Sequence, residues 1–222
     1  MHATLVRLVF GGACFICRGA ARGTLCESCD ADLPRLVDPS CPRCALESPS
    51  GALCGRCLAQ PPHYDATFAA LAYAFPADAL VHALKFRGEL ALAPLLGKLL
   101  LEKISSRDVD RVIPVPLSSQ RLRERGYNQA VEIARHLGAA KLEIDACVRE
   151  RDAPPQAGLG REARRRNVRG AFRCKRSFAG ERVALVDDVM TTGATLDALA
   201  TALKNAGAVS VTNWVVCRTA DV

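Results

Sequence analysis

Long apolar runs are missing from this 222-residue sequence, which nowhere strings together the eighteen or more apolar residues of a membrane-spanning helix. Aromatic residues make up only 5% of the chain, so platforms for base stacking are expected to be scarce. The first twelve residues are interrupted by Arg7 and lack a small-residue cleavage pattern. We therefore expect a short amphipathic helix there, and a cytoplasmic rather than an exported protein.

Cysteine, in contrast, is abundant, and eight of the eleven cysteines form four C-x-x-C pairs early in the chain. They are Cys14, Cys17, Cys26, Cys29, Cys41, Cys44, Cys54 and Cys57. Two thiolates from each of two such turns supply the four soft ligands of a tetrahedral zinc site. We predict about two structural zinc ions; the simplest pairing is sequential, and pairing the outer with the inner turns remains open. A disulfide framework is disfavoured because we expect a reducing compartment.

A Pro-rich joint at 58–64 indicates the boundary between a zinc-ribbon module, residues 1–62, and a second domain, residues 63–222. In the second domain apolar, extended patterns alternate with helical ones. Strands are expected at 67–75, 111–116, 183–187 and 208–217, and helices at 77–86, 90–104, 118–137 and 194–205. Repeated strand–helix units predict the α/β class, with a mostly parallel sheet flanked by helices.

A candidate phosphate site follows the apolar strand at 183–187. The strand delivers two adjacent carboxylates, Asp187 and Asp188, and then a turn opens the next helix. The turn consists of Thr191, Thr192, Gly193, Ala194 and Thr195. Its backbone N–H groups and the helix dipole favour an anion, while carboxylates beside it suit sugar hydroxyls. The pattern predicts binding of a phosphorylated sugar.

Positive charge is concentrated between residues 149 and 182, which hold eleven basic and four acidic side chains. The densest part contains Arg161, Arg164, Arg165, Arg166 and Arg169. Two four-thiolate zinc sites make the ribbon module net negative, so we expect the main phosphate-binding surface in this basic stretch. We interpret it as a lid with possible DNA contact; a solvated helix face is the alternative. Whether its partner is a sugar phosphate or a nucleic acid stays open.

The motif LVDDVMTTGAT resembles the phosphoribosyl diphosphate motif of type I phosphoribosyltransferases. The likeness extends to KFRG (85–88), VIPVPL (112–117), RLRERGYNQ (121–129) and REARRRNVRGAF (161–172), in the order found in the ComF family. That family, associated with bacterial competence, joins a double zinc ribbon to a type I phosphoribosyltransferase-like domain. On these motifs the chain is identified as a ComF family member.

The resemblance implies a role for each motif. Asp187 and Asp188 would contact the ribose hydroxyls, residues 191–195 would hold the 5-phosphate, and the loop 114–119 would bind pyrophosphate, with Mg²⁺ accompanying the sugar diphosphate. The pyrophosphate loop includes Val115, Pro116, Leu117, Ser118 and Ser119. Thr191 stands where transferases that salvage 6-oxopurines carry a catalytic carboxylate, and threonine is no general base near neutral pH. Purine salvage of that type is therefore disfavoured.

Two functions follow from the resemblance. One is binding of phosphoribosyl diphosphate or ribose 5-phosphate by a protein that assists internalisation of single-stranded DNA, together with the DNA-uptake machinery, in natural transformation. The other is Mg²⁺-dependent phosphoribosyl transfer to an unidentified acceptor in nucleotide metabolism.

Overall fold

The computed structural model describes residues 12–37, 39–104, 108–138, 141–151, 168 and 170–220. The helix expected at the start of the chain and the five lid arginines, 161, 164–166 and 169, lie outside these residues. None of the described helices is long and apolar enough to cross a membrane.

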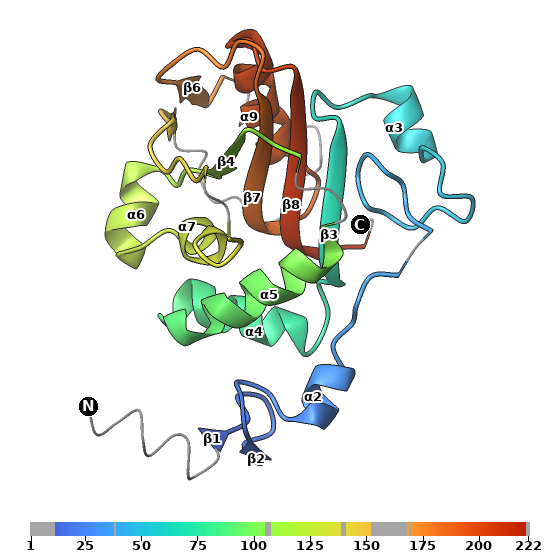
Figure 1. Cartoon of the computed structure of the whole chain (residues 1–222), viewed down its shortest axis with the longest axis vertical. Helices are drawn as coiled ribbons and strands as arrows, with labels where there is room; N and C mark the ends of the chain where they lie inside the picture. The colour runs from blue at the N-terminus through green and yellow to red at the C-terminus, as the bar shows by residue number, and fades with distance from the viewer. Residues whose placement is uncertain are drawn as a thin grey trace.

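A four-stranded parallel sheet forms the centre of the structure, with strand order β3-β8-β7-β4 (Figure 1). Its strands are β3 (Ala66–Ala72), β4 (Arg111–Pro114), β7 (Arg182–Met190) and β8 (Ser210–Arg218). Apolar side chains on both faces of β7 and β8 are buried, as expected for central strands of a covered parallel sheet. All four strands run the same way, so their carboxyl ends meet at one edge, where such sheets bind ligands. The predicted fold class is confirmed.

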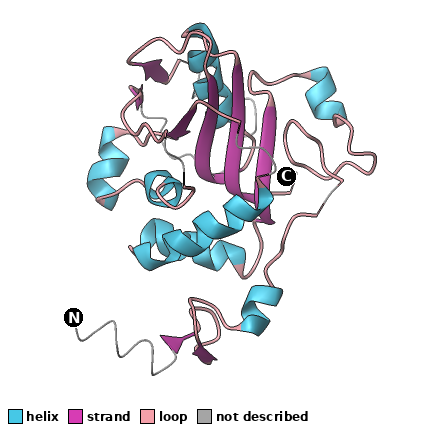
Figure 2. Ribbon diagram, viewed as in Figure 1, coloured by secondary structure: helices cyan, strands magenta, loops and turns pink. Residues whose placement is uncertain are grey.

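Helices cover both faces of the sheet (Figure 2). One face carries α4 (Ala77–Phe86), α5 (Ala93–Lys103) and α7 (Gln129–Ala134), and a 3-10 turn at Leu90–Leu92 precedes α5. The other face carries α9 (Ala194–Asn205), which buries Leu196, Leu199 and Leu203 at helical spacing. A small two-stranded antiparallel sheet of β5 (Cys147–Arg149) and β6 (Phe172–Cys174), which the sequence patterns did not predict, packs near α9.

The single helix expected at 118–137 is wrong. The chain instead forms α6 (Ser119–Arg125) and then α7. Gly126 ends α6 in the left-handed conformation (φ 81°), and Asn128 begins α7 by accepting a hydrogen bond from the Ala130 N–H at 2.9 Å. Glycine tolerates that conformation and asparagine is a strong helix N-cap, so the local sequence stops one helix and starts another.

The two cysteine ribbons lie on opposite faces of the sheet. The first contains β1 (Gly12–Ala13), β2 (Ala20–Ala21) and α2 (Glu27–Ala31), and its Phe15 and Leu25 pack against the α4/α5 face. The second contains α3 (Gly55–Ala59), and three of its cysteines are part of the core beneath α9. Between them, residues 34–36 pair antiparallel with the outer edge of β3. The Leu36 N–H donates to the Ala70 oxygen at 2.9 Å, and the Ala72 N–H donates to the Pro34 oxygen at 2.8 Å.

Candidate functional site: two cysteine clusters and an anion cleft

Each cysteine ribbon gathers four sulfur atoms within 4.8 Å of one another. The clusters are Cys14, Cys17, Cys26 and Cys29, and Cys41, Cys44, Cys54 and Cys57. The sequential pairing is thus confirmed and the crossed one is wrong. Four converging thiols, with no other ligand type, fit a closed structural zinc site. Two such sites fit two structural zinc ions per chain.

One thiol in each cluster has a lowered pKa. Burial raises the pKa of Cys14 and Cys41, but hydrogen bonds from backbone N–H groups outweigh it and bring these pKa values down to about 6 and about 7. Burial raises the pKa of Cys29 and Cys57, whose sulfurs face the other thiols of their clusters. A dication that replaces the retained protons removes this conflict, so both clusters favour metal binding.

A cleft of about 390 Å³ opens at the carboxyl edge of the sheet. It is lined by the carboxylates of Asp187 and Asp188, by Thr191 and Thr195 of the candidate 5-phosphate loop, and by the loop after β4. From that loop Val115, Pro116 and Leu117 reach the cleft wall. The segments that the sequence assigned to sugar and phosphate binding therefore face one cavity, although they lie far apart along the chain.

The two acidic residues at the end of β7 differ in environment. Asp188 is buried and forms an ion pair with Lys85, at 2.8 Å between Nζ and Oδ2. Asp187 keeps part of its surface open to the cleft, while the surrounding protein shields its carboxyl from most bulk water. Burial, and then the charge of Asp188, raise the pKa of Asp187 to about 8, and Lys85 acts in the opposite direction. Near neutral pH the pair therefore holds a proton on Asp187.

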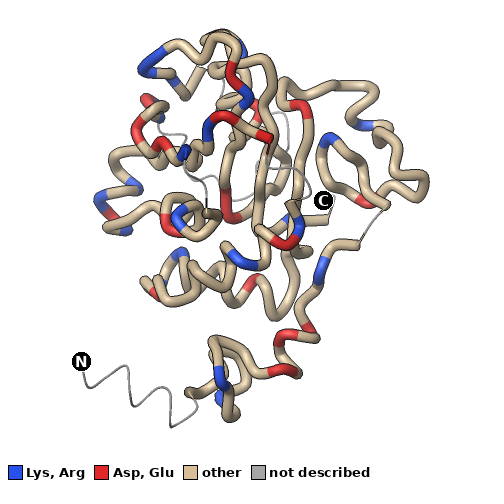
Figure 3. Tube along the Cα trace, in the orientation of Figure 1, with Lys and Arg blue, Asp and Glu red and all other residues tan. Residues whose placement is uncertain are grey.

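Cations line the same cleft. Arg121 and Arg125 come from α6, Arg149 from β5 and Lys85 from α4. The basic positions along α6 are visible at the left of Figure 3. Burial lowers the pKa of the Arg125 guanidinium, which nevertheless remains charged at neutral pH. Four cations against two carboxylates favour an anion with several phosphate oxygens.

The candidate 5-phosphate loop is held in place by neighbouring residues. Gly193 begins α9 with φ 79°, and a β-carbon there would lie 2.8 Å from the Met190 methyl and 2.9 Å from the Tyr64 hydroxyl. Only glycine fits such a position without a shift. Thr192 Oγ1 accepts a hydrogen bond from the Ala194 N–H at 3.3 Å. On the β4 side, Ser118 is buried and caps α6 by accepting from the Arg121 N–H at 3.3 Å.

Arg218, at the end of β8, joins the second ribbon to this loop. Its Nε donates to the Cys44 carbonyl at 2.9 Å, and its Nη1 donates to the carbonyls of Met190 at 3.0 Å and Thr191 at 2.5 Å. The side chain is only 2% exposed. Sequence reasoning missed both Arg218 and the Lys85–Asp188 contact. KFRG was a visible signal for Lys85, whereas a lone arginine closing a strand gave none.

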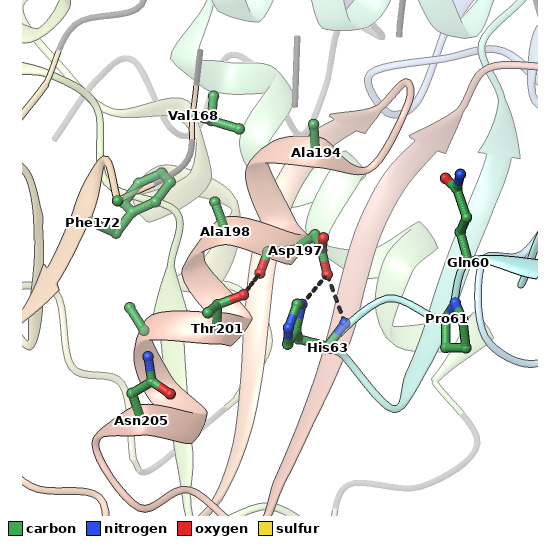
Figure 4. A pocket seen from close by; sticks show the side chains of 12 residues that line it. Gln60, Pro61, His63, Val168, Phe172, Ala194, Asp197, Ala198, Thr201 and Asn205 are labelled. Carbon is green, nitrogen blue, oxygen red and sulfur yellow. Dashed lines mark hydrogen bonds and ion pairs between the residues drawn. The ribbon is translucent and has the colours of Figure 1, made fainter. Parts of the chain in front are cut away.

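Two further groups lie away from the cleft. A second cavity, of about 410 Å³, runs along α9, where both the Nδ1 atom and the backbone N–H of His63 contact Asp197 Oδ1, at 3.0 and 2.6 Å (Figure 4). These two contacts hold the segment that follows the second ribbon against α9. The sulfurs of Cys147 and Cys174 lie 3.5 Å apart across the antiparallel pair β5–β6.

Family models match both parts of the chain. A double zinc ribbon domain matches residues 5–58, and a phosphoribosyl transferase domain matches residues 122–221. Together with the parallel sheet and the cysteine clusters, these matches define a zinc-ribbon protein with a phosphoribosyltransferase-type domain.

Curated relatives resemble nearly the whole chain. The DNA utilization protein YhgH of Escherichia coli O157:H7 is 34% identical, over 96% of this chain and 99% of the relative. Competence protein F of Haemophilus influenzae is 33% identical, over 94% and 98%. A solved purine phosphoribosyltransferase from Pyrococcus horikoshii is 21% identical, covering 54% of this chain and 67% of that one, with a TM-score of 0.34. The chain belongs to the ComF family.

Proposed function

We propose that this protein binds phosphoribosyl diphosphate, or a related sugar phosphate such as ribose 5-phosphate, in the cleft at the carboxyl edge of its sheet. The observation that carries this proposal is the convergence of two carboxylates, a glycine-turned helix start and four cations on one cavity. Carboxylates at the end of β7 suit ribose hydroxyls, the start of α9 suits the 5-phosphate, and the cations suit a pyrophosphate group.

Mg²⁺ would accompany the sugar diphosphate. It would neutralise part of the charge on the pyrophosphate oxygens, and the Asp187 carboxyl, once it has released its proton, is a hard oxygen ligand of the type that Mg²⁺ prefers. In the free protein Lys85 already neutralises Asp188, so Asp187 is the carboxylate with a surface open to the cleft.

We further propose that the protein assists internalisation of single-stranded DNA in the cytoplasm, in contact with the DNA-uptake machinery. The names of the relatives, DNA utilization protein and competence protein, support a DNA-related role. The basic stretch supports it as well, because arginine–phosphate contacts dominate affinity for nucleic acids. Phosphoribosyl transfer to an unidentified acceptor is the second candidate function. It is favoured because the proposed pyrophosphate loop after β4 lines the cleft together with the acidic pair, as a site that releases pyrophosphate would require.

Calorimetry of the zinc-loaded protein with phosphoribosyl diphosphate and Mg²⁺ tests the sugar-phosphate site. Asp187→Asn should weaken binding by about tenfold or more, since an amide neither binds the cation nor accepts as strongly from hydroxyls. Asp197→Asn, on α9 and outside the lining of the cleft, is the matched control and should bind normally. Equal affinity in the wild type and the Asp187→Asn variant would remove the sugar-phosphate assignment.

Salt titration of single-stranded DNA binding tests the second part. Replacing Arg164, Arg165 and Arg166 with Ala should flatten the dependence of log K on log salt by roughly two units, if each meets one phosphate at about −0.7 per contact. Neutralising Arg18, Arg22 and Arg43 near the cysteine clusters should change it less. An unchanged slope in the 164–166 variant would place the phosphate contacts elsewhere.

A further inference from the structure

Three exposed aromatic rings lie together near the carboxyl edge of the sheet. Among the described residues, the aromatic side chains with large exposed fractions are Tyr73 at 40%, Phe75 at 70% and Phe86 at 63%. Tyr73 and Phe75 follow β3 directly, and Phe86 ends the adjoining helix α4. The other Phe, Tyr and Trp rings among the described residues are buried or partly buried. Exposed apolar groups concentrated in this way mark an interaction surface more often than chance exposure.

A cavity of about 440 Å³ continues this surface to the first cysteine ribbon. Phe15 and Arg18 form its ribbon side, while Phe75 and His82 form its α4 side. Tyr73 lines both this cavity and the anion cleft. The ribbon and the cleft are therefore joined by one continuous surface, which we call the aromatic–arginine surface. It consists of Phe15, Arg18, Tyr73, Phe75, His82 and Phe86.

Guanidinium groups stand over the rings at both ends of this surface. The Arg18 guanidinium carbon lies 5.5 Å from the centre of the Phe15 ring, and that of Arg125 lies 5.3 Å from the centre of the Phe86 ring. The His82 and Phe86 rings, one helical turn apart on α4, have centroids 4.8 Å apart. Arg87 also lines the cavity, with Asp78 as the acidic residue there. Alternating rings and cations match a ligand that alternates flat bases with phosphates.

We propose that the aromatic–arginine surface binds single-stranded nucleic acid, stacking unpaired bases on Phe75 and Phe86 and directing the strand toward the anion cleft. A duplex cannot offer its base faces to these rings, whereas a single strand presents a base and a phosphate at every nucleotide. The inference rests on the proposed DNA role and goes further, since it assigns the base contacts to α4 and the end of β3. The arginine-rich segment would then supply phosphate contacts and this surface the stacking.

Two oligonucleotides of equal length separate stacking from charge. Fluorescence anisotropy would compare the binding of oligothymidylate with that of an abasic strand carrying the same number of phosphates. Phe75→Leu should weaken binding of oligothymidylate about tenfold, because leucine keeps the apolar bulk but has no aromatic face. Binding of the abasic strand should not change. Phe75→Trp should restore wild-type affinity for oligothymidylate, and both variants should melt at the wild-type temperature because residue 75 is exposed.

Val209→Ala is the matched control, since Val209 is 57% exposed but precedes β8 at the amino edge of the sheet. It should bind both strands normally. Wild-type affinity in Phe75→Leu and Phe86→Leu would overturn the proposal and would leave the surface to a protein partner. Equal weakening for both oligonucleotides would also overturn it. If the wild-type protein binds neither strand, the proposed DNA role itself fails, and the calorimetric test of the sugar-phosphate site is unaffected.

Discussion

Replacing Arg218 with Met tests whether one buried side chain holds the second ribbon against the candidate 5-phosphate loop. The guanidinium donates hydrogen bonds to the carbonyls of Cys44, Met190 and Thr191. Because the Arg218 side chain is only 2% exposed, water has little access to these carbonyls and cannot readily replace the lost donors. Each buried carbonyl left without a donor lowers the free energy of unfolding by about 1–3 kcal/mol. Removing the buried guanidinium charge offsets part of that loss, because the desolvation cost of the charge disappears. We expect the free energy of unfolding to fall by roughly 3 kcal/mol, a large part of the stability of an ordinary domain.

Urea denaturation of the zinc-loaded protein measures that loss, and chelator-driven zinc release locates it. One zinc ion per chain should leave Arg218→Met faster than it leaves the wild type, because Arg218 contacts the Cys41–Cys57 ribbon. Release from the Cys14–Cys29 ribbon should not change. Arg182→Met serves as control: its side chain is 41% exposed and pairs with Asp108 and Asp110, so we expect a loss below about 1 kcal/mol. Similar losses in the two variants, or equal acceleration of both zinc ions, would refute the reasoning.

Four further outcomes are expected. Elemental analysis should give about two zinc ions per chain, and Cys14→Ser should remove one while leaving sugar-phosphate binding intact, because among the described residues it is the second ribbon that Arg218 joins to the loop. The folded protein holds a proton on Asp187 that the unfolded chain loses near pH 4, so the folded state binds more protons between these values. The free energy of unfolding should therefore decline as the pH rises from 6 to 8. Denaturant titrations should show a smaller decline in Asp187→Asn. Gly193→Ala should weaken sugar-phosphate binding at least tenfold by calorimetry, as the new methyl collides with Tyr64 and Met190. Hypoxanthine and guanine, each with phosphoribosyl diphosphate, should give no nucleotide in a chromatographic assay, since Thr191 cannot act as a base. Mg²⁺-dependent nucleotide formation from either base would favour the second candidate function, phosphoribosyl transfer.

Features encoded over short stretches of sequence were predictable. Cysteine spacing predicted two four-cysteine clusters, because a C-x-x-C turn sets its two sulfurs within a few residues, and the structure then selected the sequential pairing. The acidic pair and the threonine–glycine turn likewise belong to one strand–helix connection. Gly126 and Asn128 were local signals too, and the helical periodicity around them concealed the break.

Contacts between distant segments were not predictable in the same way. Lys85 meets Asp188 across 103 positions and Arg218 meets Cys44 across 174, so only the completed sheet brings them together. Composition alone could not locate the exposed aromatic residues. A low total suggested that stacking platforms were scarce, but a count cannot show that Tyr73, Phe75 and Phe86 share one exposed surface. The three-residue strands β5 and β6 were too short to leave a periodic pattern.

Residues 34–36, between the two ribbons, also cover the edge strand β3 and so oppose pairing of the sheet with another chain. Residues 34–36 satisfy backbone groups of β3 that would otherwise form an open edge, and Thr67 donates its N–H to the Pro42 oxygen at 3.0 Å just beyond them. An uncovered apolar edge strand is a template for pairing with another chain. A fragment beginning at residue 63 would thus expose β3 and tend to aggregate. Zinc deprivation would do the same if it frees this segment, so metal supply during synthesis would decide how much of the protein stays in solution.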